Sequence, residues 1–148
     1  SKKFKVELKN SIILDLFSGT GSFGIECLSR NAKKVIFVEN YSGILPILKR
    51  NLSDLKTIDN FKIVESDIYK ENFILDENIK FDIIFLDPPY KDKNLSVIFK
   101  NILNEKILNK NGLIILHRHK KEKDDFPSNF KIIEEKNYGI SKIIFLSY

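Results

Sequence analysis

An Asp-Pro-Pro-Tyr segment, Asp87–Tyr90, carries groups suited to chemistry on a flat molecule. It follows the apolar run Phe81–Leu86, which is typical of a buried strand. The two prolines have no backbone N–H and fix φ, and a proline also favours extended backbone at the residue before it. The chain must therefore leave the strand in a stiff loop with one carboxylate, a backbone carbonyl outside the strand ladder and one aromatic ring. Acceptors beside a stacking ring suit a base that carries an exocyclic amine.

A glycine-rich segment near the start of the chain is a second candidate site. Asp15–Gly24 joins a strand-like run to a helix-like run and contains G-x-G-x-x-G at Gly19, Gly21 and Gly24. Glycines there let the backbone turn tightly and approach a ligand. Glu39, at the end of the next predicted strand, is placed to bind both hydroxyls of a ribose. The pattern indicates an adenosine-like ligand but does not identify a reaction.

Asp15 separates two kinds of adenosine ligand. A nicotinamide or flavin dinucleotide would place its pyrophosphate over the glycine turn and the helix N-terminus, where a carboxylate would repel it. S-adenosylmethionine carries a sulfonium, an ammonium and no phosphate, so the same carboxylate attracts it. The residues therefore favour S-adenosylmethionine as the cofactor.

Asp67 follows the third predicted strand and is a candidate adenine contact. Its carboxylate could accept a hydrogen bond from the adenine amine, with Ile68 packed on the adenine face. Alternatively, Asp67 caps a helix that begins at Ile68. Both roles are compatible, because Ser66 can serve as the cap instead.

Strand-like and helix-like segments alternate along the chain, and they must position these loops. Strands are expected at Ser11–Phe17, Lys34–Glu39, Phe61–Glu65, Phe81–Leu86, Gly112–His117, Phe130–Lys136 and Lys142–Ser147. Helices are expected at Ser22–Arg30, Ser42–Leu55, Ile68–Leu75 and Leu95–Leu108. Alternation favours a parallel sheet with helices on both faces, and the last two strands, joined by a turn at Tyr138-Gly139, must be antiparallel. The predicted fold is α/β: a Rossmann-like, doubly wound, mostly parallel seven-stranded sheet ending in an antiparallel hairpin.

Composition limits the kind of protein. The 148 residues fit one domain, and no apolar run approaches the roughly 18–20 residues of a membrane span. The single cysteine, Cys27, suits a reducing cytoplasm and is expected to be a small buried residue on a helix. A net charge of +5 and a pI near 9.2 allow a polyanionic partner such as nucleic acid. A cytoplasmic protein without a membrane partner is expected.

A basic run, His117–Lys121, follows the fifth predicted strand. Two histidines at alternate positions could suggest a metal, but no further Cys/His cluster in the sequence supports one, and no metal is expected. The run is interpreted as a solvated basic loop, with a contact to RNA phosphate as the alternative.

These residues resemble the class I, Rossmann-like S-adenosylmethionine-dependent methyltransferases. Within that class, Asp15–Ala32 (DLFSGTGSFGIECLSRNA) is closely similar to the bacterial 16S ribosomal RNA guanine-N2 methyltransferases of the RsmD type. Glu39, Asp87–Tyr90 and the turn at Tyr138-Gly139 also match that pattern. The resemblance extends from about Ile12 to the end of the chain.

The resemblance implies S-adenosylmethionine as cofactor. It also implies ribosomal RNA, or an assembly intermediate of the small ribosomal subunit, as the partner, and a protein that acts as a monomer. The implied cofactor contacts are Asp15, Phe17, Gly19, Gly21, Glu39, Asp67 and Ile68, and the implied contacts to the target base are Asp87, Pro88 and Tyr90. Family members also carry an N-terminal arm that binds RNA and covers the cofactor. Here Ser1–Asn10 precede the first predicted strand, so we expect a single methyltransferase domain, residues 1–148, with the arm missing or shortened.

The expected reaction is methyl transfer to the exocyclic N2 amine of a guanine. An adenine-N6 methyltransferase of nucleic acid shares the Asp-Pro-Pro-Tyr arrangement and is the main alternative, although such enzymes usually have a sizeable target-recognition segment. Protein-glutamine methyltransferases more often have Asn at the position of Asp87. A nucleotide-dependent oxidoreductase and a non-catalytic RNA-binding module are alternatives from other classes.

Overall fold

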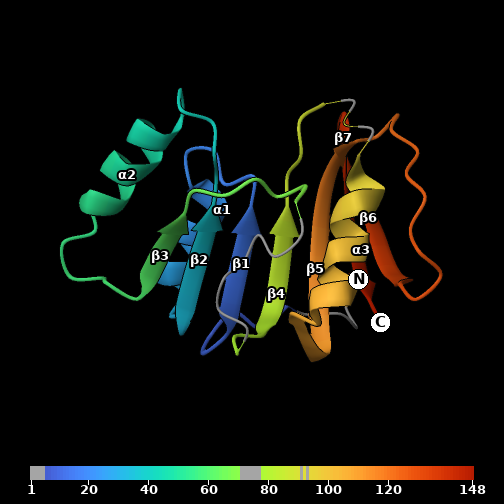
Figure 1. Ribbon diagram of the computed structural model, residues 1–148, viewed down its shortest axis with the longest axis horizontal. Coiled ribbons are helices and arrows are strands. Elements are labelled where there is room, and N and C mark those ends of the chain that lie inside the picture. Colours follow the sequence, from blue (N-terminus) through green and yellow to red (C-terminus); the bar gives the residue numbers. More distant parts are fainter. Residues whose placement is uncertain (1–5, 71–77, 91, 93) are drawn as a thin grey trace.

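The computed structural model describes residues 6–70, 78–90, 92 and 94–148. Their strands form one seven-stranded sheet in the order β3-β2-β1-β4-β5-β7-β6 (Figure 1). The strands are β1 (Ile12–Leu16), β2 (Lys34–Val38), β3 (Phe61–Val64), β4 (Phe81–Leu86), β5 (Leu108–His119), β6 (Lys131–Tyr138) and β7 (Ser141–Ser147). The helices are α1 (Ser22–Ser29), α2 (Leu45–Ser53) and α3 (Leu95–Glu105).

The strand order reverses in the middle of the sheet. Strands β1 to β5 are parallel, and the chain adds β2 and β3 on one side of β1 before it adds β4 and β5 on the other. In open α/β sheets such a reversal leaves a crevice outside the carboxyl ends of the two central strands, and ligands bind there. β7 is antiparallel to both β5 and β6. The predicted fold, including the closing antiparallel hairpin, is confirmed.

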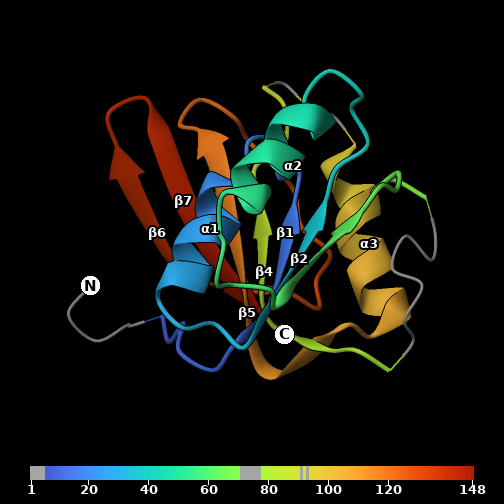
Figure 2. The same ribbon diagram turned by 90° about the vertical axis from the view of Figure 1, so that its left-hand side faces the viewer.

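Helices cover both faces of the sheet because its central strands bury apolar side chains on both sides. Cys27 of α1 and Leu48 of α2 share a core cluster with Ile13 of β1. Phe99 of α3 packs in a second cluster with Leu14, the next residue of β1. Figure 2 shows α1 and α3 on opposite sides of the sheet. The alternation along β1 therefore directs Asp15, like Ile13, toward α1.

The segment after α3 departs from the prediction. Apolar spacing predicts a helix over Leu95–Leu108, but α3 ends at Glu105. Lys106 has a left-handed φ of 53°, which ends the helix. β5 then runs over Leu108–His119, beyond the predicted Gly112–His117 at both ends. Pairing with β4, a contact between distant segments, decides this boundary rather than the local helical period.

Two other predicted helices also differ in extent. The predicted helix Ser42–Leu55 corresponds to α2, which is shorter at both ends and covers Leu45–Ser53. A proline lies in its first turn, where the missing backbone N–H costs no hydrogen bond. A helix was also predicted over Ile68–Leu75. Residues 68–70 form a turn, and residues 71–77 lie outside the described residues.

Cys27 is a buried helix residue, as predicted, and is 1% exposed. Burial, with a smaller contribution from the Asp15 carboxylate, raises the pKa of its thiol to about 12. The thiol is therefore unreactive near neutral pH. None of the helices in the described residues combines the length and apolar character needed to span a bilayer.

Candidate active site

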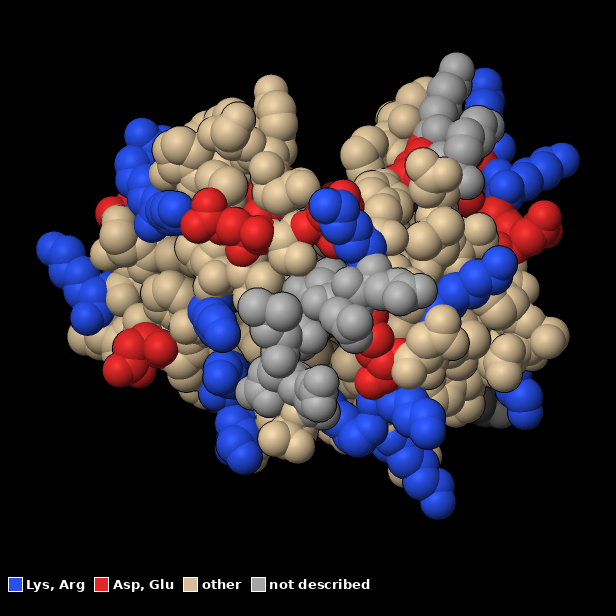
Figure 3. Space-filling view, viewed as in Figure 1, with Lys and Arg blue, Asp and Glu red and all other residues tan. Residues whose placement is uncertain are grey.

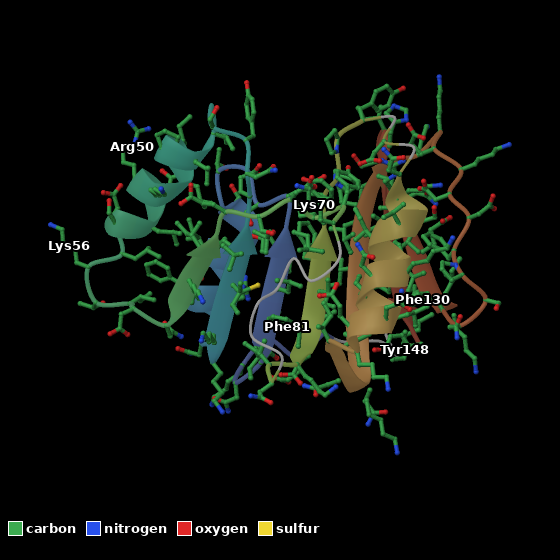
Figure 4. All side chains as sticks on the ribbon, viewed as in Figure 1. Arg50, Lys56, Lys70, Phe81, Phe130 and Tyr148 are labelled. Carbon is green, nitrogen blue, oxygen red and sulfur yellow. The ribbon has the colours of Figure 1, made fainter. Side chains whose placement is uncertain are left out.

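The predicted site residues lie at the edge of the sheet where the parallel strands have their carboxyl ends. The space-filling view shows a notch in the outline of the molecule above the ends of β1 and β4 (Figure 3), where the strand order reverses. The segment that follows β3 crosses the same edge, and Lys70 lies just beyond these two strand ends (Figure 4). Segments distant in the sequence therefore meet around one crevice.

The glycine-rich turn leaves β1 through three residues with left-handed backbone. Phe17, Gly19 and Gly21 have φ values of 58°, 56° and 88°, which only glycine adopts at little cost. Ser18 fixes the turn: its Oγ donates to the Asp15 carbonyl at 2.6 Å, and its backbone N–H donates to the carbonyl of the last residue of β2 at 3.3 Å. A Cβ at Gly19 would meet no atom within 4 Å, so there is open space beside the turn.

Asp15 is buried beneath this turn, with 1% of its surface exposed. Its Oδ2 accepts a hydrogen bond from the backbone N–H of Gly24 at 3.1 Å. A Cβ on Gly24 would lie 2.3 Å from the ring of Phe37, so this close approach of α1 to the sheet needs glycine. Burial raises the pKa of Asp15 from 3.8 to about 8, the Gly24 hydrogen bond opposes the rise, and the Asp87 and Glu39 carboxylates add to it. Acidic groups from three strand ends therefore lie close enough for Asp87 and Glu39 to disfavour the ionised form of Asp15.

Glu39 follows β2 and binds the glycine turn directly. Its Oε1 accepts a hydrogen bond from the backbone N–H of Gly19 at 2.9 Å, and its Oε2 accepts one from the N–H of Tyr41 at 3.1 Å. An ionised carboxylate has about four acceptor sites, so both oxygens can also accept hydroxyl groups. The contact of Glu39 with a ribose stays a prediction. The structure shows in addition that Glu39 stabilises the glycine turn.

Asp67 and Ile68 follow β3. The Asp67 Oδ1 accepts a hydrogen bond from the Tyr69 N–H at 2.9 Å, so the side chain closes a turn. A capping residue makes the same bond, to the backbone N–H two residues further along. Ile68 is 5% exposed and lies in the core cluster on the α3 side, which leaves little of it for a ligand. The rings of Phe17 and Tyr69 lie 5.8 Å apart between centres. The first turn and the segment after β3 are therefore neighbours.

The Asp-Pro-Pro-Tyr loop forms one wall of a hollow of about 200 Å³, which Asp87, Pro88, Tyr90, His117, Arg118, His119 and Ser141 line. Tyr90 is 61% exposed, and its ring meets that of His119 edge-on, with 5.2 Å between ring centres. Asp87 Oδ1 lies 2.9 Å from the Nδ1 of His117. The loop therefore brings a carboxylate and an aromatic ring to one hollow.

Arg118 corrects the interpretation of residues 117–121 as a solvated loop. His117–His119 belong to β5, and Arg118 is 3% exposed. Its Nε and Nη2 donate to the two carboxylate oxygens of Asp124 at 2.9 and 3.0 Å, and Glu122 lies 3.4 Å from Nη2. The sequence contains a signal for this arrangement. Arg118 lies two residues after Leu116 and so on the same face of the strand, and the acids Glu122, Asp124 and Asp125 follow it.

The Arg118 guanidinium also holds the acceptor loop, which consists of Asp87–Tyr90 and the nearby Asp92. Its Nη1 donates to the Pro89 carbonyl at 3.3 Å, and its Nη2 donates to the Asp92 carbonyl at 3.2 Å. The Tyr69 hydroxyl donates to the Asp92 carboxylate. The loop is therefore tied to β5 and to the segment after β3. These contacts join distant residues, and no spacing in the sequence identifies them.

The charge of the site suits a cationic ligand. Within the described residues, no ion pair joins Asp15, Glu39 or Asp67 to a lysine or arginine. A pyrophosphate would be repelled by the ionised carboxylates of this group, whereas a sulfonium and an ammonium would be attracted to them and would favour the ionised form of Asp15. The open space at Gly19 leaves room for a ligand beside the turn. The residues present therefore fit S-adenosylmethionine.

Comparison with known proteins agrees with this geometry. A family model described as "Conserved hypothetical protein 95" matches residues 2–147. The chain is 32% identical over 137 residues to the "Ribosomal RNA small subunit methyltransferase D" of Haemophilus influenzae, and the match covers 90% of this chain and 69% of that protein.

Two solved structures have a similar fold. HI0767 of Haemophilus influenzae is 30% identical with a TM-score of 0.78, and the match covers 94% of this chain and 87% of that one. The yhhF protein of Escherichia coli is 25% identical with a TM-score of 0.80, covering 94% of this chain and 76% of that one. Since the family model spans nearly the whole chain, the chain belongs to the Conserved hypothetical protein 95 family, that of the ribosomal RNA small subunit methyltransferases D.

Proposed function

We propose that the chain transfers a methyl group from S-adenosylmethionine to the exocyclic N2 amine of a guanine in 16S ribosomal RNA. The observation that carries this proposal is the position of Asp87 and Tyr90, which join a hydrogen-bond acceptor and a stacking ring beside the acidic crevice. Relatives named as methyltransferases of small-subunit ribosomal RNA support the RNA substrate.

S-adenosylmethionine, when bound, supplies an electrophilic methyl group on a sulfonium. The proposed contacts to it come from the ends of β1, β2 and β3, and they are Asp15, Phe17, Gly19, Gly21, Glu39, Asp67 and Ile68. Asp15 and the glycine turn serve the cationic methionine part, Glu39 the ribose, and the residues after β3 the adenine. Since Glu39 also bonds the Gly19 N–H, ribose binding and the shape of the turn depend on one side chain.

The acceptor loop overcomes the weak nucleophilicity of an exocyclic amine, whose lone pair is delocalised into the ring. Asp87 and the Pro88 carbonyl accept hydrogen bonds from the two N–H groups, which favours a tetrahedral nitrogen and stabilises the positive charge that develops as the N–C bond forms. Tyr90 stacks on the base and fixes its plane. The remaining contribution is proximity, because the nitrogen must lie in line with the methyl carbon. The electrons of the methyl–sulfur bond would remain on the departing thioether, and the methylated nitrogen would release its extra proton to solvent.

The family relationship favours guanine over adenine, since either amine would satisfy the same acceptors. We further propose that residues 1–148 form one methyltransferase domain and act as a monomer in the cytoplasm. Its substrate there is ribosomal RNA or an assembly intermediate of the small subunit.

The test is transfer of labelled methyl groups from S-adenosylmethionine to small ribosomal subunits prepared from cells that lack this protein. Digestion of the RNA to nucleosides and chromatography are expected to give N2-methylguanosine. N6-methyladenosine would support the adenine alternative instead. Failure to label any nucleoside, in subunits and in naked RNA alike, would rule the proposal out.

Asp87→Ala tests the acceptor role. Transfer is expected to fall by about a hundredfold or more, because the carboxylate acts on the developing charge, while the Kd for S-adenosylmethionine measured by calorimetry stays nearly unchanged. Asp59→Asn is the matched control, since Asp59 is an exposed carboxylate in the connection between α2 and β3. Turnover of Asp87→Ala at the rate of the Asp59→Asn control would sink the mechanism.

A further inference from the structure

β5 reaches the acceptor loop on both faces of the sheet. Leu86 of β4 pairs with Leu116 of β5 in parallel register, so the next residues, Asp87 and His117, lie side by side. Successive side chains of a strand point to opposite faces. Arg118 accordingly binds the loop backbone on the α3 side, while His117 contacts the Asp87 side chain on the other.

The contact between His117 and Asp87 constrains both groups. The Nδ1 of His117 lies 2.9 Å from Oδ1 of Asp87. Since an ionised carboxylate only accepts hydrogen bonds, Nδ1 must carry the hydrogen. One carboxylate oxygen is then engaged, and the rotation of the side chain is restricted. Oδ2 can accept a hydrogen bond from a further donor.

We propose that His117 is a positioning residue for methyl transfer: it orients the Asp87 carboxylate toward the target amine, and protonation of its ring slows the reaction. This inference rests on the proposed function. With a neutral ring, Asp87 keeps its full charge for the nitrogen that becomes positive. With a protonated ring, an ion pair forms and part of that charge is neutralised. The side chains of His117 and Asp87 are 37% and 50% exposed, so protons from solvent reach the ring.

Within the described residues, His117 forms its ion pair with Asp87. The β7 residue in register with His117 is Ile143, which is apolar. On the side of α1, Phe23 stacks on Phe85 of β4, with 3.9 Å between ring centres. Tyr90, Arg118 and His119 are the other titratable groups that line the same hollow. Lys142 of β7 lies next to Ile143 and is in register with Arg118 of β5. Of these, Arg118 and Lys142 pair with each other one register position further along, so their side chains start on the opposite face.

Two variants of His117 separate orientation from titration. His117→Ala removes the donor and the titrating ring, and kcat on ribosomal RNA is expected to fall on the order of tenfold while the KM for S-adenosylmethionine is unchanged. His117→Asn keeps a neutral donor near the Nδ1 position. It is expected to retain most of the wild-type kcat at alkaline pH and to lose the decrease in kcat at acid pH that is expected of the wild type.

His119→Gln is the comparison for the pH profile, because it removes the other histidine of the hollow. This variant is expected to keep the decrease in kcat at low pH, whatever its effect on RNA binding. A His117→Ala enzyme with the wild-type kcat and the wild-type pH profile would overturn the inference. So would a loss of the low-pH decrease in His119→Gln but not in the His117 variants.

A measurement without catalysis distinguishes this inference from the proposed function. Nitrogen-15 NMR of the imidazole is expected to show the Nδ1–H tautomer for neutral His117, and to show a shift toward Nε2–H in Asp87→Ala. An Nε2–H tautomer in the wild type overturns the inference even if RNA is methylated. The Nδ1–H tautomer together with no methylation of any RNA overturns the proposed function, and with it the role of His117.

Discussion

At the scale of single residues, Asp15 holds a proton more tightly than an exposed aspartate because the fold buries it. Burial raises its pKa to about 8, and the neighbouring carboxylates of Asp87 and Glu39 contribute to the rise. Near neutral pH the carboxyl group of the ligand-free protein is therefore mostly protonated. A bound cation favours the ionised form, so cation binding and proton loss are coupled.

S-adenosylmethionine is accordingly expected to release a proton when it binds near neutral pH. Its affinity should increase as the pH rises toward about 8 and level off above that value, because the carboxyl group is then already ionised. Calorimetric titration in two buffers of different ionisation enthalpy measures the released proton. Asp15→Asn keeps the size of the side chain and an acceptor for the Gly24 N–H, and should bind without this release. Equal binding heats in both buffers for the wild type would contradict the coupling.

At the scale of elements, β5 and the acceptor loop act as one unit. The guanidinium of Arg118 binds two carbonyls of the loop and two carboxylates of the following segment while it is almost fully buried. A buried cation that contacts four acceptor groups gives the loop a fixed position. Loss of the cation would remove the ion pair that the Asp124 carboxylate forms with Arg118. Stability and loop position therefore depend on the same side chain.

Arg118→Gln is expected to lower the free energy of unfolding by about 3 kcal/mol, the usual cost of removing one partner of a buried ion pair. Methyl transfer should fall in the same variant at temperatures where it remains folded, since the loop loses two backbone contacts. Urea unfolding and single-turnover transfer measure the two effects. Arg30→Gln is the matched control, because Arg30 forms an exposed ion pair with Glu26 and should change stability by less than about 0.5 kcal/mol. Equal stability of the two variants would disprove the anchoring role of Arg118.

At the scale of the whole molecule, the sheet places an acidic crevice in a chain with a net charge of +5. The carboxylates gather at the strand ends, where they suit a small cationic ligand. Lysine and arginine side chains are spread over the face of the molecule that Figure 3 shows, and they suit a polyanion. The two proposed substrates therefore depend on opposite charges.

Salt is expected to affect the two substrates differently. Affinity for ribosomal RNA should fall by about tenfold or more between about 50 and 200 mM salt, because binding to phosphates releases counterions. Affinity for S-adenosylmethionine should change much less, since its contacts are few and partly buried. Filter binding of RNA and calorimetry with S-adenosylmethionine over the same salt series test this difference. An RNA affinity that does not respond to salt would exclude a phosphate-dominated contact.

Much of the fold and of the candidate site follows from local patterns in the sequence. Apolar runs separated by helix-like segments predict the alternating strands and helices, and Asp15–Gly24, Glu39 and Asp87–Tyr90 each lie at or just after the carboxyl end of such a run. Because parallel strands have their carboxyl ends at one edge, these groups meet without further information. Helix ends were predicted less well, since pairing of Leu108 in the sheet overrides the helical period before it.

The sequence by itself determined the fold class, the acidic glycine turn and the acceptor loop, because each depends on residues that are near one another in the chain. The tertiary structure alone decided the pKa of Asp15, the burial of Arg118 and the contact of His117 with Asp87. These features depend on how deeply a group is covered and on the register of β4 against β5. Both are set by packing between distant segments. For this reason local patterns predict a solvated loop at His117–Lys121, whereas His117–His119 belong to β5, the strand that holds the acceptor loop.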